Sequence, residues 1–494
     1  MLLFMAGDTK RSAEVYSGSV NLMLIGDSLT DACFGADKAI PGYIISVTKA
    51  NPGSVNKATH LLASNDSVYH HSVLGMTELN GNIYTATVTD ANNYTLGVNT
   101  TSYGTHTANS GKSFVTDNDK FKKHPRGYLT HLQQFSKQRF ITKLKWNRGI
   151  SSEKSADVLA RIGVTPIAAD GINLVILMIG TNDFPNGVSL ATYQSNVTAI
   201  ISAIHSAGAR VCICTVPPRN ADTSGQKDIK DQANAWIMTL GSTAAGAQIY
   251  VADVYTTVAD GSRNWQTNYT YDNVHPSARG AMKIGEVIWQ KLSTIYTSGS
   301  YSEGTNLLTN GSLTGSSAAP AGTNGFIATS WGVSLVGPVD ASIRTLSKNS
   351  NDQQEVELNL NGTQTSNEAV GLIQTFSSPV SGTWYKVQAN LSIIELTGDA
   401  TLVKEFSLAL LDNTNAVRGI DSGATSGTPT EAIGADTLLT KGDLSMETPA
   451  FKYPSSGLSS LKARVLLRCD GTGTIRVKYR VKNISLVAVS DPYS

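Results

Sequence analysis

The sequence contains little charge and almost no excess of either sign. Charged residues make up 16% of the 494 residues, and the formal net charge is +1. A nucleic-acid-binding protein needs a basic footprint, so nucleic acid is not an expected partner. No apolar run approaches the roughly 18 residues that a membrane-spanning helix requires, which leaves a membrane out of the expected partners as well. The apolar residues 1–5 are too few for a signal peptide and have no basic flank.

Cysteine is also scarce. The four cysteines are scattered along the chain and match no metal-binding spacing, so neither a disulfide framework nor a metal or other cofactor is expected. No apolar heptads that would drive a coiled coil are present, and the sequence leaves the oligomeric state open. Ser, Thr, Asn and Gly are abundant instead, especially after residue 300, a composition common in secreted and virion-surface β proteins.

Residues 20–43 and 120–297 alternate between short apolar runs and helical patterns. Such alternation predicts a parallel sheet with helices on both faces. The clearest helical stripes fall within 190–207 and 277–296. The expected strands are 21–26, 140–146, 174–179, 210–216 and 248–254.

Residues 44–117 interrupt this rhythm with short β runs and turn residues, and no helical period appears. Turns are indicated at Asn80-Gly81 and at 90–93. The segment is therefore predicted to be a small β module inserted into the α/β domain. Residues 75–81, with the following Tyr84-Thr85, resemble a small β-barrel repeat of phage tail proteins.

The composition changes again near residue 299, where 299–305 form a predicted linker. Residues 306–494 alternate apolar and polar side chains between many turn residues, which predicts a β-sandwich. The opening run 306–313 and the closing run 481–486 resemble jelly-roll carbohydrate-binding modules. Trp331 and Trp384 have two interpretations, stacking on a sugar ring or packing in the sandwich core, and the second is favoured.

Four of the predicted turns that follow strands each carry one part of an acyl-transfer site. Ser28 follows the first strand, where open α/β sheets keep their ligands. Asp272 lies three residues before His275, a spacing at which a carboxylate can orient an imidazole that acts as a base. Asn182 offers an amide donor for an oxyanion, and Gly149 a backbone N–H that a ligand can approach without a Cβ in the way.

These four turns resemble the SGNH (GDSL) hydrolase family. Gly26-Asp27-Ser28-Leu29 matches its first sequence block, Gly149 its second, Gly180-Thr181-Asn182-Asp183 its third and Asp272-x-x-His275-Pro276 its last. The chain departs from the family at Ser151-Ser152, where Ser-Gly is common. The resemblance implies Ser28 as nucleophile, His275 as base and Asp272 as its orienting acid. It also implies an oxyanion hole formed by the Ser28 and Gly149 N–H groups and the Asn182 amide.

The family implies a flavodoxin-like three-layer α/β/α catalytic domain, here residues 1–43 and 118–298, and ester hydrolysis without a metal. The expected substrate is an O-acetylated polysaccharide, with Asp183 and Arg219 as candidate substrate contacts. The alternatives are a broad short-chain esterase or thioesterase, and a glycan-binding phage tail adhesin whose hydrolase domain is vestigial. The β insertion favours a virion location, with an extracellular enzyme as the alternative. A homo-oligomer is possible, and it would be a trimer if the chain is a tail protein.

Overall fold

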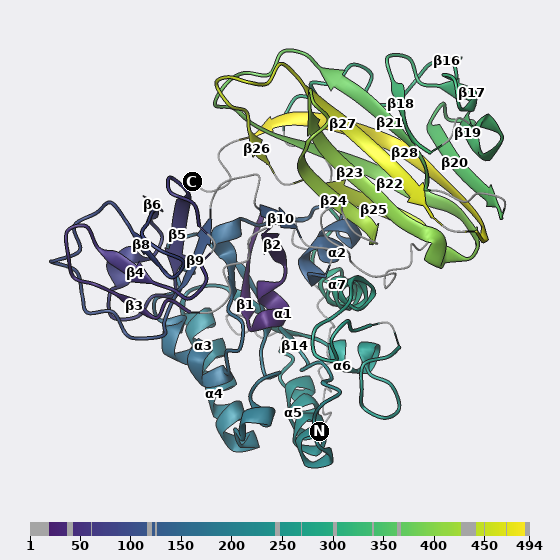
Figure 1. The fold of residues 1–494 in the computed structure, drawn as a ribbon. Coiled ribbons are helices and arrows are strands. Elements are labelled where there is room, and N and C mark those ends of the chain that lie inside the picture. The colour runs from purple at the N-terminus through teal and green to yellow at the C-terminus, as the bar shows by residue number, and fades with distance from the viewer. Residues whose placement is uncertain are drawn as a thin grey trace, which may run out of the picture.

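The computed structural model describes most of the chain as three strand-containing bodies (Figure 1). The described residues are 19–36, 43–60, 62–115, 121–123, 126–242, 248–267, 269–299, 304–337, 340–362, 367–425, 441–448, 450–470 and 472–489. Within these residues, no helix is both long and apolar enough to cross a bilayer.

The first body is built on a parallel sheet. Its strands are β1 (Val20–Gly26), β11 (Phe140–Ile141), β12 (Asn147–Gly149), β13 (Leu174–Met178), β14 (Arg210–Cys214) and β15 (Ile249–Ala252). The order is β11-β1-β13-β14-β15, with β12 also pairing with β1. Numbered in chain order, the strands have the flavodoxin-like arrangement 2-1-3-4-5. All of them are parallel, and the order in which successive strands are added to the sheet reverses between β1 and β13. The predicted strand 140–146 is wrong in part, because it contains only β11 and then a 3₁₀ turn at Leu144–Trp146.

Successive strand residues point to opposite faces of the sheet, and the residues on both faces are apolar. Leu22 and Leu24 of β1 belong to one core, and Met23 and Ile25 belong to the other. Helices α2 (Tyr128–Phe135), α6 (Val254–Val258) and α7 (Ala278–Leu292) cover the first face. Helices α3 (Ser155–Ile162), α4 (Leu190–Ser206) and α5 (Ser224–Thr239) cover the second. The predicted α/β architecture with helices on both faces is confirmed.

The second body, residues 43–115, is called the inserted module below. It contains two small antiparallel sheets, with orders β3-β4-β8-β7 and β6-β5-β9, around a shared core that includes Val55, Val68 and Tyr94. Its strands are β3 (Ser46–Val47), β4 (Ser54–Asn56), β5 (Ser67–His71), β6 (Ile83–Thr85), β7 (Thr87–Val88), β8 (Asn93–Thr95) and β9 (Lys112–Val115). The chain segments on either side of the module pair with each other, as β2 (Phe34–Ala36) and β10 (Phe121–Lys123).

The third body contains two larger, mostly antiparallel sheets that enclose one core. The first sheet has the order β16-β17-β19-β20-β28-β22-β25, and the second has the order β18-β21-β27-β23-β24. Trp331 and Trp384 are both buried, which agrees with packing in the sandwich rather than with exposed sugar platforms. The strands are β16 (Ser317–Ala318), β17 (Asn324–Ile327), β18 (Gly332–Val336), β19 (Arg344–Lys348), β20 (Gln354–Asn361), β21 (Glu368–Phe376), β22 (Trp384–Gly398), β23 (Val403–Asp412), β24 (Val417–Thr425), β25 (Gly442–Glu447), β26 (Phe451–Lys452), β27 (Leu461–Cys469) and β28 (Thr474–Val489).

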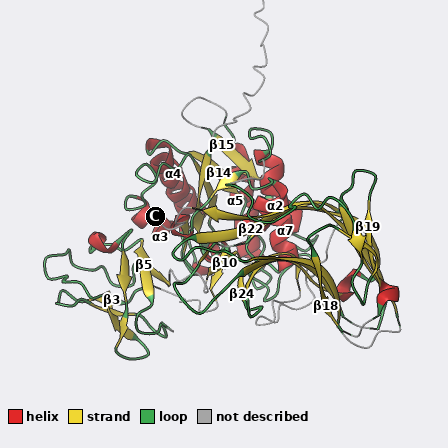
Figure 2. Cartoon of the chain, turned by 90° about the horizontal axis from the view of Figure 1, so that it is seen from above, coloured by secondary structure: helices red, strands yellow, loops and turns green. Residues whose placement is uncertain are grey.

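The two β-rich bodies lie on different sides of the α/β body (Figure 2). Helix α2 contacts β25, which joins the third body to the first. The inserted module lies near the end of the sheet at which β1 leads into α1 (Ser28–Asp31), as Figure 1 shows. This places the module beside the candidate site.

Candidate active site

Ser28 is the first residue of the short helix α1, directly after β1. Asp27 caps the helix, since one of its carboxylate oxygens accepts the Leu29 N–H at 3.0 Å. Gly26 is required at the end of the strand, because a Cβ there would lie 2.1 Å from the Met178 carbonyl oxygen. Close packing of β1 on β13 and the Asp27 cap therefore fix the turn that presents the Ser28 hydroxyl.

His275 and Asp272 are far from Ser28 in sequence but lie beside its hydroxyl in the structure. His275 Nε2 lies 2.8 Å from Ser28 Oγ, although 247 residues separate the two in sequence. On the far side of the ring, His275 Nδ1 lies 2.7 Å from Asp272 Oδ2. The His275 and Asp272 side chains keep 28% and 39% of their surface exposed, so the site opens to solvent.

The electrostatics of Asp272 favour its ionised form. Partial burial by itself raises the pKa of this carboxyl, but hydrogen bonds from the His275 backbone, the His275 ring and the Val274 backbone outweigh it and hold the pKa below its ordinary value. Asp272 Oδ1 accepts the His275 N–H at 2.7 Å and the Val274 N–H at 3.0 Å. The turn thus supplies a negative charge at the imidazole nitrogen remote from Ser28.

Residues outside the predicted set also border the triad-like group. The Tyr271 ring stacks on the His275 ring with centroids 5.9 Å apart, and the Arg126 guanidinium lies 3.9 Å from the Tyr271 ring centre. Asn220, in the loop after β14, bonds to Asn273 within the turn. Tyr271 could have been suspected from its position next to Asp272, and Asn220 from its position next to Arg219, but nothing in the sequence marks Arg126.

Asn182 lies in the turn after β13, as predicted. Its Nδ2 donates to the backbone carbonyl of Glu153 at 3.0 Å, and the backbone carbonyl of Asn182 accepts from Asn186 Nδ2 at 2.7 Å. An amide nitrogen carries two hydrogens, so the bond to Glu153 orients the group and leaves the second hydrogen for another acceptor. The geometry is compatible with the predicted donor role.

Gly149 does not fit its predicted role as an oxyanion donor, because its N–H already donates to Asn147 Oδ1 at 3.1 Å. The absence of a side chain has another reason: a Cβ at Gly149 would lie 2.2 Å from the Asp31 nitrogen of α1. Ser152, three residues further along, has a positive φ of 71°. Within the described part of the chain its N–H donates to no acceptor, which makes it the better donor candidate in this loop. The departure at Ser151-Ser152 was the only sequence signal for it.

Asp183 is a correction to the sequence-based site. Its side chain is buried rather than exposed to substrate. Its carboxylate accepts the Ser155 N–H at 3.1 and 3.0 Å and also the Ser155 hydroxyl. Burial raises the pKa of this carboxyl, and the Ser155 hydrogen bonds oppose that rise. Asp183 therefore anchors the first turn of α3, and its burial argues against the predicted contact with a substrate.

Arg219, the other predicted substrate contact, lies in the loop that includes Asn220. Its guanidinium is partly exposed and lies 3.7 Å from Asp222, whose second partner is Lys230 at 2.6 Å. The pair with Asp222 holds Arg219 without burying it. Contact between Arg219 and a substrate stays a prediction.

Asp27, beside the candidate nucleophile, is buried. Burial raises the pKa of Asp27 to about 7, the Leu29 N–H lowers it, and the neighbouring Asp183 and Glu153 raise it. The candidate site therefore combines an exposed carboxylate with a depressed pKa and a buried carboxyl with a raised one.

One family model matches part of this chain. The sequence model of the GDSL-like Lipase/Acylhydrolase family matches residues 105–283. That range contains Asn182, Asp272 and His275, whereas Ser28 precedes the inserted module and lies outside it. No curated protein sequence is significantly similar to the chain.

Solved structures of esterases and lipases show partial similarity. An acetylxylan esterase from Geobacillus stearothermophilus is 17% identical, with a TM-score of 0.32 over 57% of this chain and 96% of its own. A carbohydrate esterase family 3 protein from Talaromyces cellulolyticus is 18% identical, with a TM-score of 0.26 over 31% and 74%. A GDSL-like lipase from Bacteroides thetaiotaomicron is 21% identical, with a TM-score of 0.25 over 32% and 76%.

Proposed function

We propose that the chain is a serine ester hydrolase in which Ser28 is the nucleophile, His275 the general base and Asp272 its orienting acid. The observation that carries the proposal is the continuous hydrogen-bonded series from Asp272 Oδ2 through His275 to Ser28 Oγ, at 2.7 and 2.8 Å. A nucleophile within hydrogen-bond reach of a base, which a third group orients, is the arrangement that acyl transfer requires. The acylhydrolase domain that the family comparison supports is consistent with it.

In the acylation step, Ser28 Oγ attacks the ester carbonyl carbon while His275 Nε2 takes the hydroxyl proton. Asp272 stabilises the imidazolium that forms. The tetrahedral oxyanion accepts hydrogen bonds from the free hydrogen of the Asn182 amide and from the Ser28 N–H, which lies in the first helical turn and has no intrahelical acceptor. The Ser152 N–H is the third donor in this proposal.

The imidazolium then returns its proton to the leaving alkoxide, which departs as an alcohol and leaves an acyl-enzyme on Ser28. Water attacks the acyl carbon in the second half of the reaction, with His275 again as base. The carboxylic acid leaves and the Ser28 hydroxyl is restored. Each oxyanion donor contributes on the order of 10²–10³ in rate at comparable sites.

We propose O-acetyl groups of a polysaccharide as the substrate. The exposed surface of His275 and Asp272 supports this choice, because a partly open site admits an ester carried on a long chain. The additional β-rich bodies beside the catalytic domain are consistent with a polymeric substrate that is held at more than one place.

Acetate release from a panel of acetylated xylans and bacterial surface glycans tests the proposal, with p-nitrophenyl acetate as a small reference ester and Ser28→Ala as the blank. We expect the wild type to release acetate from at least one glycan and Ser28→Ala to release none while keeping the wild-type circular dichroism spectrum. Turnover of p-nitrophenyl acetate alone would favour a broad short-chain esterase. Glycan binding by the wild type without any ester turnover would overturn the enzyme assignment in favour of an adhesin.

A further inference from the structure

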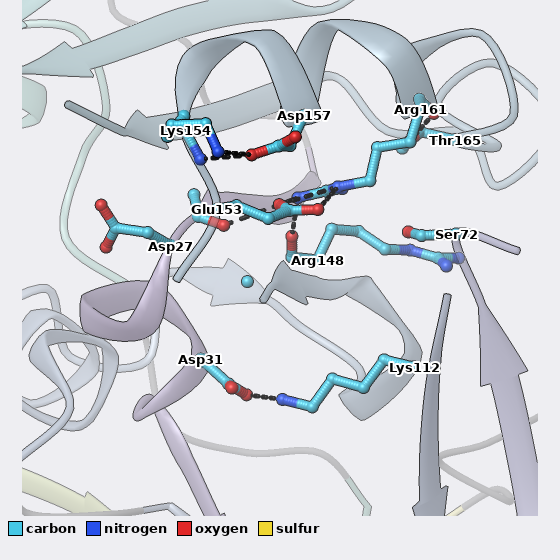
Figure 3. A network of polar contacts seen from close by, with 12 residues as sticks. Asp27, Asp31, Ser72, Lys112, Arg148, Glu153, Lys154, Asp157, Arg161 and Thr165 are labelled. Carbon is cyan, nitrogen blue, oxygen red and sulfur yellow. Dashed lines mark hydrogen bonds and ion pairs between the residues drawn. The ribbon is translucent and has the colours of Figure 1, made fainter. Parts of the chain in front are cut away.

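The inserted module contacts the candidate active site at the carboxylate of Asp31. Lys112, the first residue of β9 in the module, forms an ion pair with Asp31, the last residue of α1 (Figure 3). The other Asp31 oxygen accepts the Ser151 hydroxyl at 2.8 Å. Asp31 thus joins three parts of the chain: the helix that begins with Ser28, the module, and the loop of residues 147–153.

Asp31 and Ser28 lie in the same short helix. The two residues are the ends of a four-residue helix, in which the Asp31 N–H donates to the Asp27 carbonyl at 2.9 Å. The 147–153 loop is bound to the same turn, because the Ile150 N–H donates to the Gly26 carbonyl at 3.0 Å and Asn147 Nδ2 donates to the Asp31 carbonyl at 3.2 Å. The loop and the helix therefore form one unit with Asp31 between them.

The same loop holds two of the proposed oxyanion donors in place. Ser152 directly follows Ser151, whose hydroxyl bonds to Asp31. At its end, the Glu153 carbonyl accepts the Asn182 amide, and the Glu153 carboxylate is held by Arg161, with Nε 2.8 Å from one carboxylate oxygen. Glu153 and Arg161 are both buried, and Figure 3 shows their side chains meeting beneath α3.

We propose that Lys112 is a positioning residue, through which the inserted module holds Asp31 and the 147–153 loop in the arrangement that ester hydrolysis requires. The proposal rests on the function proposed above. Lys112 and Asp31 keep only 6% and 15% of their side-chain surface exposed, so their attraction is weakly screened by solvent. Removal of the lysine leaves a largely buried carboxylate without its ion-pair partner, and we expect Asp31 to move toward water and to displace Ser151, which is bonded to it.

Two further contacts join the module to this region. Arg148 of the 147–153 loop donates from its guanidinium to the Tyr69 hydroxyl of the module at 3.2 Å. Lys57, also of the module, is buried, and burial together with Lys112 lowers its pKa to about 7, while Asp31 opposes that change. The module therefore directs two lysines and a tyrosine toward one loop and one helix of the catalytic domain.

The test compares Lys112→Met with Lys112→Arg in the full chain, using kcat and KM for p-nitrophenyl acetate. We expect Lys112→Met to lower kcat roughly 10- to 100-fold with KM within about twofold, because misplacement of about 1 Å at a reacting centre costs up to 10²-fold. Lys112→Arg keeps the charge and restores most of kcat. The matched control is Lys386→Met, which removes a similarly buried ion pair with Glu447 in the third body and leaves kcat at the wild-type value.

A double-mutant cycle separates positioning from simple stabilisation. If Lys112 acts through Asp31 and Ser151, the combined Lys112→Met and Ser151→Ala variant loses little more kcat than the worse single variant. A folded Lys112→Met variant with wild-type kcat, or strictly additive effects in the cycle, would overturn the proposal. If Lys112→Met does not fold, Lys112→Met combined with Asp31→Asn leaves no unpaired buried carboxylate, and wild-type kcat in that variant would overturn it equally.

The two proposals fail in different ways. Absence of ester turnover in the wild type, or full turnover in Ser28→Ala, overturns the proposed function before any Lys112 variant is measured. Ester turnover that depends on Ser28 but is unchanged in Lys112→Met upholds the function and overturns only the positioning role.

Discussion

Asn220 and Asn273 are joined by two hydrogen bonds, one between backbones and one between side chains. The Asn220 N–H donates to the Asn273 carbonyl at 3.0 Å, and Asn220 Nδ2 donates to Asn273 Oδ1 at 3.0 Å. Asn273 lies between Asp272 and His275 and has a positive φ of 71°. The loop after β14 therefore holds the turn that carries both candidate catalytic side chains.

Asn220→Ala is expected to lower kcat about tenfold with little change in KM. The substitution removes the side-chain hydrogen bond to Asn273 and the acceptor of the Trp265 backbone N–H at 2.8 Å. The turn that carries Asp272 and His275 then loses part of its support, while its own residues are unchanged. Steady-state kinetics with p-nitrophenyl acetate measure the effect. An increase in KM with kcat unchanged would show that this loop only binds substrate.

Asp272→Asn is expected to lower kcat by roughly 10²–10⁴-fold and to leave the fold intact, because the amide keeps the size of the carboxylate but removes its charge.

The hydrogen bonds that hold the pKa of Asp272 below its ordinary value also decide how its contribution to stability changes with pH. Its contribution to stability is present above the pKa of the unfolded chain and is lost only as the pH falls through the lower folded-state pKa. A titration of the Asp272 carboxyl by NMR would contradict this if its midpoint lay above that of an ordinary aspartate.

Asn182→Ala is expected to reduce kcat about 10²-fold and to change KM far less, because in the proposed mechanism the amide donates to an oxyanion that exists fully only in the transition state. Kinetics over a full range of substrate concentration separate the two parameters. Loss confined to KM would assign Asn182 to substrate binding alone.

Asp27→Asn is expected to flatten the pH dependence of stability. Burial raises the folded-state pKa of Asp27 to about 7 from 3.8, so the folded protein binds the extra proton between these values and loses stability as the pH rises from about 4 to about 7. The amide does not titrate and keeps an acceptor for the Leu29 N–H. Urea unfolding at pH 5 and pH 8 should show that the free energy of unfolding of the variant, relative to wild type, increases with pH. The same difference at both values would contradict the raised pKa.

Asp183→Ala is expected to lower the free energy of unfolding by about 1–3 kcal/mol, because it leaves the buried Ser155 N–H without its acceptor. The KM of the folded fraction should stay near that of wild type, since the side chain does not reach the open side of the site. Chemical unfolding and steady-state kinetics measure the two effects separately. A large rise in KM with unchanged stability would restore Asp183 to the substrate contacts.

The α/β body could be predicted well because its signals are local. The apolar strands and amphipathic helices have periods that are visible in the sequence, and the five expected strand regions all contain strands of the sheet, with 140–146 shortened. The polar residues that follow β1, β13 and β15 could be grouped in advance, because the carboxyl ends of parallel strands share one edge. The structure then brings Ser28, Asp272 and His275 together.

Other assignments could not be made correctly from the sequence. Asp183 and Asn182 are adjacent in the same turn, yet one side chain anchors α3 and the other can donate to a ligand. Gly149 resembles an oxyanion donor, but its N–H bonds to Asn147 and its missing side chain serves the packing on α1. Such roles depend on side-chain direction and on partners from distant segments.

The sequence by itself determined the class of fold, and it indicated the turn of the candidate nucleophile and the candidate acid–base pair, because periodicity and short motifs encode local structure and chemistry. The substrate and the virion location stay predictions, and the oligomeric state stays open. Only the tertiary structure decided which groups are buried, which N–H groups are already bonded, and that Lys112 of the inserted module faces Asp31. The physical reason is that desolvation and hydrogen bonding depend on contacts between residues far apart in the chain, such as the 81 positions that separate Lys112 from Asp31.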